Sequence, residues 1–257
     1  MRVLLKWFVF SFLISAYFAT SALTVLLAGR LKSRSRTRIT RFYSSWIAWA
    51  LGLRVRQYGD RPLAASPLLI VANHLSYLDI LVLFSSYPCR FITSVEVRDT
   101  PFLGWLCRCA GCLFVERREP RRIGAEVRAV ASTLEGEEAL VLFPEGTSGN
   151  GERVLPFKTS FLQCAIETGA TVAPICLVYE SIDGQNVDSA NRDDVYWYGD
   201  MSFFPHLKRV MRLHRVEIGL HYLNPITVGP QTRRREIGEE SYALIESAFR
   251  RYSKAIV

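Results

Sequence analysis

The sequence lacks the signatures of several common functional classes. Its 257 residues carry a net charge of +8, and such a basic excess fits nucleic acid, anionic membranes or acidic substrates. It contains no zinc finger and no aromatic RNA-binding motif, so nucleic acid is not an expected partner. It also contains no Gly-x-Ser-x-Gly segment, so the serine nucleophile of the α/β-hydrolases is not expected either.

Charged residues are missing from Trp7 to Gly29, a stretch of 23 residues. As a helix this stretch would reach about 34 Å, enough to cross a hydrocarbon core. A cleaved secretory signal is the alternative, because Arg2 and Lys6 precede it. A basic run without acidic residues follows, and it favours an uncleaved membrane anchor with the remaining chain on the cytoplasmic side. The run consists of Arg30, Lys32, Arg34, Arg36, Arg38 and Arg41.

The segment from Phe42 to Leu53 contains Trp46 and Trp49. Two tryptophans suit a membrane interface, and a buried helix of the following domain is the other interpretation. We therefore predict a membrane-anchoring segment over residues 1–52 and one domain over residues 53–257, a size that suits a single domain.

Three of the six cysteines lie close together, at Cys107, Cys109 and Cys112. Such spacing is compatible with metal ligands, but no fourth ligand stands nearby and Cys112 lies in an apolar run. We therefore predict no metal site, and buried thiols in a reducing compartment.

From Leu53 onward, short apolar runs alternate with stretches of helical periodicity. This alternation predicts an α/β sheet with helices on its faces. Strands are expected at 53–58, 67–72, 90–95, 111–116, 139–143, 171–179 and 214–223, and helices at 76–87, 121–135, 158–168, 205–213 and 236–253.

A polar cluster, Asn73 to Asp79, lies where the strand at 67–72 ends and a helix is expected to begin. Ligand sites in open α/β sheets form at the carboxyl ends of strands. His74 is a candidate general base there, and Asp79 is a candidate partner for its second ring nitrogen. Simple capping of the helix is the other interpretation of the same residues.

A second cluster, Phe143 to Ser148, follows the apolar run at 139–142. Together the clusters resemble the motifs of the lysophospholipid and glycerolipid acyltransferase family, which includes the 1-acylglycerol-3-phosphate acyltransferases. Four motifs occur in the family's order over about 53–177: His74-x4-Asp79, Gly111 to Arg117, Phe-Pro-Glu-Gly-Thr at 143–147, and an apolar segment around Pro174.

The resemblance implies a mixed α/β sheet flanked by helices, with an N-terminal membrane helix. It implies transfer of a fatty acyl group from acyl-CoA or acyl carrier protein to the 2-hydroxyl of 1-acylglycerol 3-phosphate. His74 would be the base and Asp79 its partner, with no cofactor and no covalent enzyme intermediate. The enzyme would lie at the cell membrane, with its catalytic domain on the cytoplasmic side.

The acceptor's phosphate would be bound by residues of the second and third motifs. Arg117 is the first candidate, because a guanidinium binds phosphate through two hydrogen bonds. Gly146 permits close backbone approach and Thr147 offers a hydroxyl. We expect Glu145 to pair with Arg117 or to bind the glycerol hydroxyl. Lys158 either adds positive charge near the phosphate or lies in solvent.

Two features differ from the family's common pattern: Ser160 stands where glycine is usual, and Glu116 where aspartate is usual. The aromatic stretch 195–204 could line an acyl channel or form a core cluster under a loop. Two alternatives to the proposed activity stay open. One is an acyltransferase for another lysolipid, such as a lysophospholipid or lyso-ornithine lipid. The other is a non-catalytic membrane lipid-binding protein.

Overall fold

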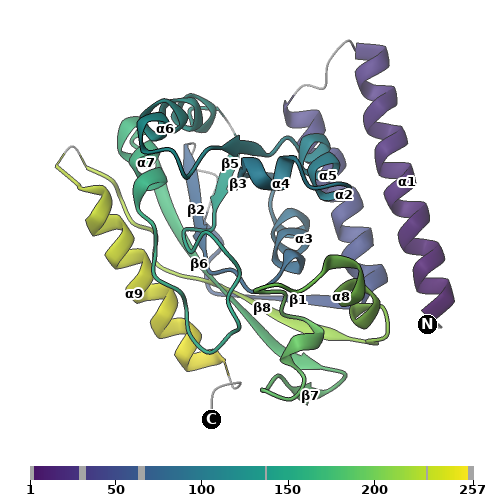
Figure 1. The fold of residues 1–257 in the computed structure, drawn as a ribbon. Helices are drawn as coiled ribbons and strands as arrows, with labels where there is room; N and C mark the ends of the chain where they lie inside the picture. Colours follow the sequence, from purple (N-terminus) through teal and green to yellow (C-terminus); the bar gives the residue numbers. More distant parts are fainter. Residues whose placement is uncertain (1–2, 29–32, 63–66, 137, 230, 254–257) are drawn as a thin grey trace.

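The structure is a computed structural model that describes residues 3–28, 33–62, 67–136, 138–229 and 231–253. Its centre is a sheet with the strand order β1-β8-β6-β2-β5-β3-β4, to which β7 adds by pairing with β6 (Figure 1). The strands are β1 (Leu53–Tyr58), β2 (Leu68–Ala72), β3 (Cys89–Ser94), β4 (Leu113–Val115), β5 (Ala139–Leu142), β6 (Thr171–Ile182), β7 (Gln185–Asn186) and β8 (Val216–Tyr222).

The sheet is mixed, which confirms the predicted fold class. Strands β6, β2, β5, β3 and β4 run parallel to one another, β8 runs antiparallel to β6, and β1 is parallel to β8. Every residue of β2 is buried, as expected for a strand covered on both faces. The parallel arrangement brings the carboxyl ends of β2, β5 and β4 to one edge.

Helices cover both faces of the sheet (Figure 1). α1, α2 and α3 lie on one side, and α6, α7 and α9 on the other. The helices are α1 (Val3–Ala28), α2 (Ser33–Leu51), α3 (Tyr77–Ser86), α4 (Val95–Arg98), α5 (Leu103–Ala110), α6 (Pro120–Leu134), α7 (Gln163–Thr168), α8 (Phe203–Val210) and α9 (Arg234–Tyr252), with 3₁₀ turns at Ser160–Leu162 and Arg192–Asp194.

Two helices, α4 and α5, were not expected from the sequence. α5 follows Phe102, which has a φ of 67° and makes no side-chain cap, so the usual polar signal for a helix start is missing. Gly111, in the left-handed conformation, ends α5 and leaves only Leu113–Val115 for β4. The predicted strand 111–116 was therefore too long.

α2 is longer than predicted, because the basic residues from Arg34 to Arg41 form its first turns. Its remaining turns have one buried face and one exposed face. Ile47 and Leu51 belong to the hydrophobic core, whereas Trp46 and Trp49 are 48% and 51% exposed. The helix is thus buried on one face, and a membrane contact of its tryptophans stays a prediction.

α1 is long and apolar enough over Val3–Leu27 to cross a membrane by length and composition. It lies along α2 (Figure 1). Near its start, Lys6 Nζ donates hydrogen bonds to the backbone oxygens of Leu51, at 3.0 Å, and of Leu213. Further along, the Tyr17 hydroxyl lies 3.0 Å from Thr40 Oγ1. α1 is therefore fixed to α2 at two points and, through Lys6, to Leu213 ahead of β8.

The division into an anchor over 1–52 and a domain over 53–257 stays a prediction. Several residues used for it, Arg2, Gly29, Arg30 and Lys32, lie outside the described residues.

Candidate active site

His74 and Asp79 lie together in the loop that joins β2 to α3. His74 Nδ1 is 3.0 Å from Asp79 Oδ2, and the imidazole stacks on the ring of Phe143, with the ring centroids 4.1 Å apart. The His74 side chain keeps 16% of its surface exposed, whereas Asp79 is completely buried. The imidazole is therefore held on one side and accessible on another.

Asp79 also makes three further hydrogen bonds. Its Oδ2 accepts the backbone N–H groups of Leu75, at 2.7 Å, and Ser76, at 2.9 Å, and its Oδ1 accepts the hydroxyl of Tyr179 at 2.7 Å. Asp79 and Ser76 together form a capping box at the start of α3. The two interpretations of this carboxylate, helix cap and histidine partner, thus hold at the same time.

Glu145 binds backbone rather than Arg117. One carboxyl oxygen accepts the N–H of His74 at 2.6 Å, and the other accepts the N–H of Leu155 at 2.7 Å. The expected pairing with Arg117 is therefore absent from the described contacts. Because the side chain is buried, its desolvation raises the pKa of Glu145 to about 8, against the opposing effect of the two N–H bonds.

The loop after β5 holds His74 by both of its backbone groups. Glu145 accepts the His74 N–H, and the backbone N–H of Gly149 donates to the His74 oxygen at 2.8 Å. Glu145 is thus a positioning residue for the loop that carries the imidazole.

Arg117, Gly146 and Lys158 line one cavity of about 360 Å³ beside this loop. Burial lowers the pKa of Arg117, whose Nη2 donates to the Ile92 oxygen at 3.2 Å. Its Nε is buried and has no partner within the described part of the chain. No carboxylate is among the cavity's described lining residues. Two cations without a neighbouring carboxylate, a partly buried Arg117 and an exposed Lys158, suit an anionic ligand.

Gly146 is required by this arrangement. Its φ is 75°, and a Cβ there would lie 3.0 Å from Lys158 Nζ. Thr147, in contrast, is exposed and does not line the cavity. Arg118 is exposed too, and its Nε lies 2.9 Å from a carboxyl oxygen of Glu96. The structure therefore brings Lys158 together with Arg117 and leaves Thr147 and Arg118 outside.

Phe143 lies between His74 and the cavity lined by Arg117 and Lys158. Its ring stacks on the imidazole on one side and contributes to the lining of the cavity. A ligand whose charged group enters the cavity would therefore have its next atoms near His74.

Sequence reasoning gave no role to two residues that support the site. Asn73 exchanges two hydrogen bonds with the backbone of Leu177 on β6, at 2.9 and 2.7 Å. Tyr179, two residues further along the same strand, donates to Asp79. Both contacts join segments about a hundred positions apart, and no local pattern in the sequence marks them.

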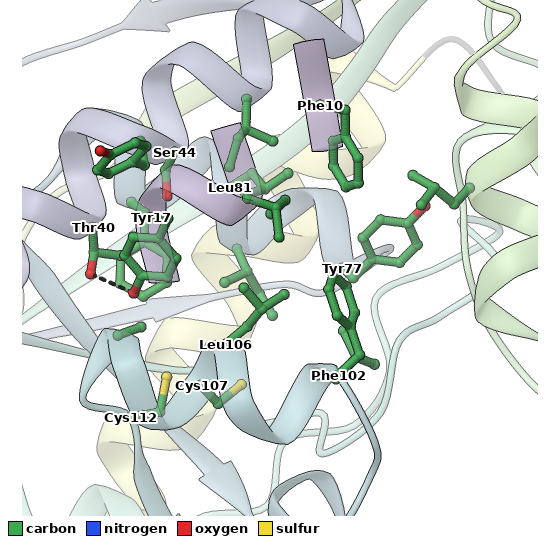
Figure 2. Close-up of a pocket in the computed structure, with 18 of the residues that line it drawn as sticks. Phe10, Tyr17, Thr40, Ser44, Tyr77, Leu81, Phe102, Leu106, Cys107 and Cys112 are labelled. Atoms are coloured by element: carbon green, nitrogen blue, oxygen red, sulfur yellow. Dashed lines mark hydrogen bonds between the residues drawn. The ribbon is translucent and has the colours of Figure 1, made fainter. Parts of the chain in front are cut away.

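A large apolar cavity of about 780 Å³ lies between the N-terminal helices and the domain (Figure 2). Its walls come from α1, α2, α3, α5 and α8. Tyr77, at the start of α3, forms part of the wall, and the Tyr17–Thr40 hydrogen bond lies in another part. Of the aromatic stretch, Tyr196 is a buried core residue and Phe203 lines this cavity. The core interpretation therefore holds for Tyr196, and an acyl channel lined by this stretch stays a prediction.

Comparisons with known proteins agree with the geometry. A family model described as Acyltransferase matches residues 54–178. A lyso-ornithine lipid O-acyltransferase from Brucella abortus is 32% identical to this chain, over 85% of this chain and 86% of the relative. The chain belongs to the glycerolipid acyltransferase family. The predicted family is confirmed, and the protein is an acyltransferase.

Other relatives of this acyltransferase have a different name. A 1-acyl-sn-glycerol-3-phosphate acyltransferase from Neisseria gonorrhoeae is 31% identical, over 75% of this chain and 72% of the relative. The crystal structure of the 1-acyl-sn-glycerophosphate acyltransferase PlsC from Thermotoga maritima has the same fold. It matches with a TM-score of 0.69 and 19% identity, over 100% of this chain and 98% of that chain.

The buried Glu145 predicts a pH-dependent stability. The folded protein keeps the Glu145 proton to about pH 8, whereas the unfolded chain releases it near pH 4.3. Its contribution to stability is complete below the unfolded pKa and is lost as the pH rises towards 8. The free energy of unfolding should fall by on the order of 1 kcal/mol per pH unit in that window.

Glu145→Gln should remove this slope, and thermal unfolding in detergent micelles between pH 5 and pH 8 measures it. Glu167→Gln, at an exposed carboxyl on α7, is the matched control and should keep the slope. An unchanged slope in Glu145→Gln would refute the assignment.

Gly151 supports the Asp79 network through Tyr196. A Cβ at Gly151 would lie 2.2 Å from Tyr196 Cε2, and the Tyr196 ring packs edge-on against Tyr179, which bonds Asp79. Gly151→Ala should cost about 1–3 kcal/mol through this clash, in addition to the strain of its positive φ. Gly199→Ala carries similar strain with nothing within 4 Å. Equal decreases in melting temperature for the two variants would contradict the clash.

Proposed function

We propose that this acyltransferase moves a fatty acyl group from an acyl thioester to the 2-hydroxyl of 1-acylglycerol 3-phosphate, giving phosphatidate. The observation that carries the proposal is that the His74–Asp79 pair lies next to the cavity of Arg117 and Lys158. An imidazole held by Asp79 and a cavity with Arg117 and Lys158 share the ring of Phe143. One site suits proton transfer and the other suits a phosphate.

His74 acts as the general base in this mechanism. The Asp79 carboxylate accepts from Nδ1, so Nδ1 carries the proton and Nε2 is free to take the proton of the acceptor hydroxyl. The hydroxyl oxygen attacks the thioester carbonyl carbon, the carbon–sulfur bond breaks, and the imidazolium returns the proton to the thiolate. No cofactor and no covalent enzyme intermediate take part. The donor is acyl-CoA or acyl carrier protein.

A second acceptor, lyso-ornithine lipid, is supported by the names of relatives, including the one from Brucella abortus. An ornithine headgroup has a carboxylate, which Arg117 and Lys158 would hold in the same way. It also has an ammonium group, and the described lining of their cavity contains no acid to receive it. The cavity's charge therefore favours the phosphate of 1-acylglycerol 3-phosphate.

The apolar cavity between the N-terminal helices and the domain is the proposed place for an acyl chain. Its lining is almost entirely hydrocarbon and aromatic, as in most sites for apolar ligands. Tyr77, in its wall, belongs to the helix that Asp79 caps. Because Tyr77 is only three residues from His74 in the chain, the apolar cavity lies next to the loop that carries His74.

The proposed location is the cytoplasmic side of the cell membrane. The outer faces of α1 and α2 expose large apolar side chains, among them Phe8, Phe12, Trp46 and Trp49. The bonds of Lys6 to Leu51 and Leu213, and of Tyr17 to Thr40, keep α1 on α2 and on the chain before β8. They favour a helix pair inserted in one leaflet over a helix that leaves the domain to cross the bilayer. The basic start of α2 suits anionic headgroups on the cytoplasmic side.

Acyl transfer by the purified protein tests the proposal. The donors are labelled acyl-CoA and acyl carrier protein, and the acceptors are 1-acylglycerol 3-phosphate, glycerol 3-phosphate, other lysophospholipids and lyso-ornithine lipid. Transfer to 1-acylglycerol 3-phosphate should fall at least about 10²-fold in His74→Ala, because the base is removed. Transfer to lyso-ornithine lipid alone would replace the acceptor and keep the mechanism. Near-normal turnover by the variant would refute the base.

Arg117 and Arg118 form a matched pair for testing the phosphate site. Arg117→Ala should raise the KM for the acceptor about tenfold or more and leave the KM for the donor nearly unchanged, because a buried charge pair with the phosphate is lost. Arg118→Ala, at an exposed side chain outside the cavity, should change neither. Equal effects of the two substitutions in steady-state kinetics would remove Arg117 from the site.

A further inference from the structure

The end of α5 and the turn that follows it place two cysteines, Cys107 and Cys112, side by side in the wall of the apolar cavity. Gly111, with a φ of 75°, turns the chain after Ala110. The backbone N–H of Cys112 then donates to the oxygen of Cys107 at 2.9 Å. Both residues line the cavity. In Figure 2 their sulfur atoms project from the end of α5 to the same side, towards the apolar side chains.

The pKa values of the two thiols are shifted in opposite directions. A hydrogen bond with the Cys112 thiol lowers the pKa of Cys107, and the same contact raises the pKa of Cys112. Burial raises the pKa of the other four cysteines, Cys89, Cys109, Cys164 and Cys176. Cys107 is thus the thiol whose pKa is shifted towards the nucleophilic thiolate form, and Cys112 lies beside it.

Positive charge surrounds the turn between them. Arg90 Nε donates to the oxygen of Gly111 at 2.6 Å, and a Cβ on Gly111 would lie 2.7 Å from Arg36 Nη1. Of the three cysteines near this turn, Cys109 is the one whose pKa Arg36 lowers, against the larger effect of burial. Cys109, one residue from the end of α5, is half-exposed and does not line the cavity.

We propose that Cys107 and Cys112 are a modification site for hydroperoxides, converted to a disulfide in the wall of the apolar cavity. The Cys107 thiolate attacks the outer peroxide oxygen, the O–O bond breaks, and the alkoxide takes a proton and leaves as an alcohol. Cys107 is then a sulfenic acid. The Cys112 sulfur attacks it, an S–S bond forms, and water leaves. One hydroperoxide is reduced as two thiols are oxidised. An apolar cavity favours hydroperoxides of fatty chains.

The disulfide fixes the last turn of α5 to the start of β4. Leu106 and Ala110, in the same turn, line the cavity, and a fixed turn prevents them from moving apart to admit a long chain. Oxidation should therefore reduce the use of long acyl chains more than short ones. This consequence, unlike the disulfide itself, rests on the proposed function of the cavity.

Peptide mapping of the full-length protein, treated with cumene hydroperoxide in detergent micelles, tests the disulfide. Trypsin cleaves after Arg98, Arg108 and Arg117, which separates Cys107 from Cys112. A joined peptide of residues 99–108 and 109–117 should form in the wild type and in Cys109→Ser, and dithiothreitol should release it. It should be absent from Cys107→Ser and Cys112→Ser. No joined peptide in the wild type, or one that needs Cys109 instead of Cys112, would overturn the proposal.

Acyl transfer with long-chain and short-chain donors tests the consequence. Oxidation should lower the long-to-short rate ratio at least about fivefold, reversibly, and Leu106→Trp should lower it in the reduced protein by filling the cavity. A shift in Leu106→Trp without a shift on oxidation would overturn the regulatory role of the disulfide. No shift in either would overturn the acyl-chain assignment of the cavity, whereas the joined peptide would still establish the thiol site.

Discussion

The carboxylate of Asp79 is the group on which the rest of the site depends. It is completely buried, and it is satisfied by hydrogen bonds from two backbone N–H groups, a tyrosine hydroxyl and an imidazole. A buried charge is tolerated only when such partners surround it. Because the partners come from the end of β2, the start of α3 and the middle of β6, this one charge fixes the relative positions of all three.

A second buried carboxyl, Glu145, extends this arrangement to the next loop. It bonds the backbone of the residue whose side chain Asp79 holds. His74 is thus positioned from both ends, its ring by one carboxyl group and its main chain by the other. The parallel pairing of β2 with β5 brings the two loops to the same edge of the sheet, so the strand order itself makes the contact possible.

The sequence predicted those parts of the structure that depend on local pattern. Apolar runs located the main strands, and the order of four short motifs identified the family. Of the two partners predicted for Glu145, Arg117 was wrong, because a charge-based argument takes no account of the nearer backbone N–H groups, and the glycerol hydroxyl stays a prediction. Tyr179 was missed because its contact with Asp79 depends on the pairing of β2 with β6. The apolar cavity was not predictable either, since five helices from distant parts of the chain form its walls.

Because α1 forms part of the wall of that cavity, mutations in this helix also affect the interior of the enzyme. Phe10, Ile14 and Tyr17 belong to α1, the helix with the composition of a membrane anchor, and they also line the cavity. Removing α1 to obtain a water-soluble fragment would therefore open one side of the cavity to solvent. For the same reason, mutations that adapt α1 to a different bilayer also alter the inner surface of the enzyme, so lipid environment and ligand preference are expected to evolve together.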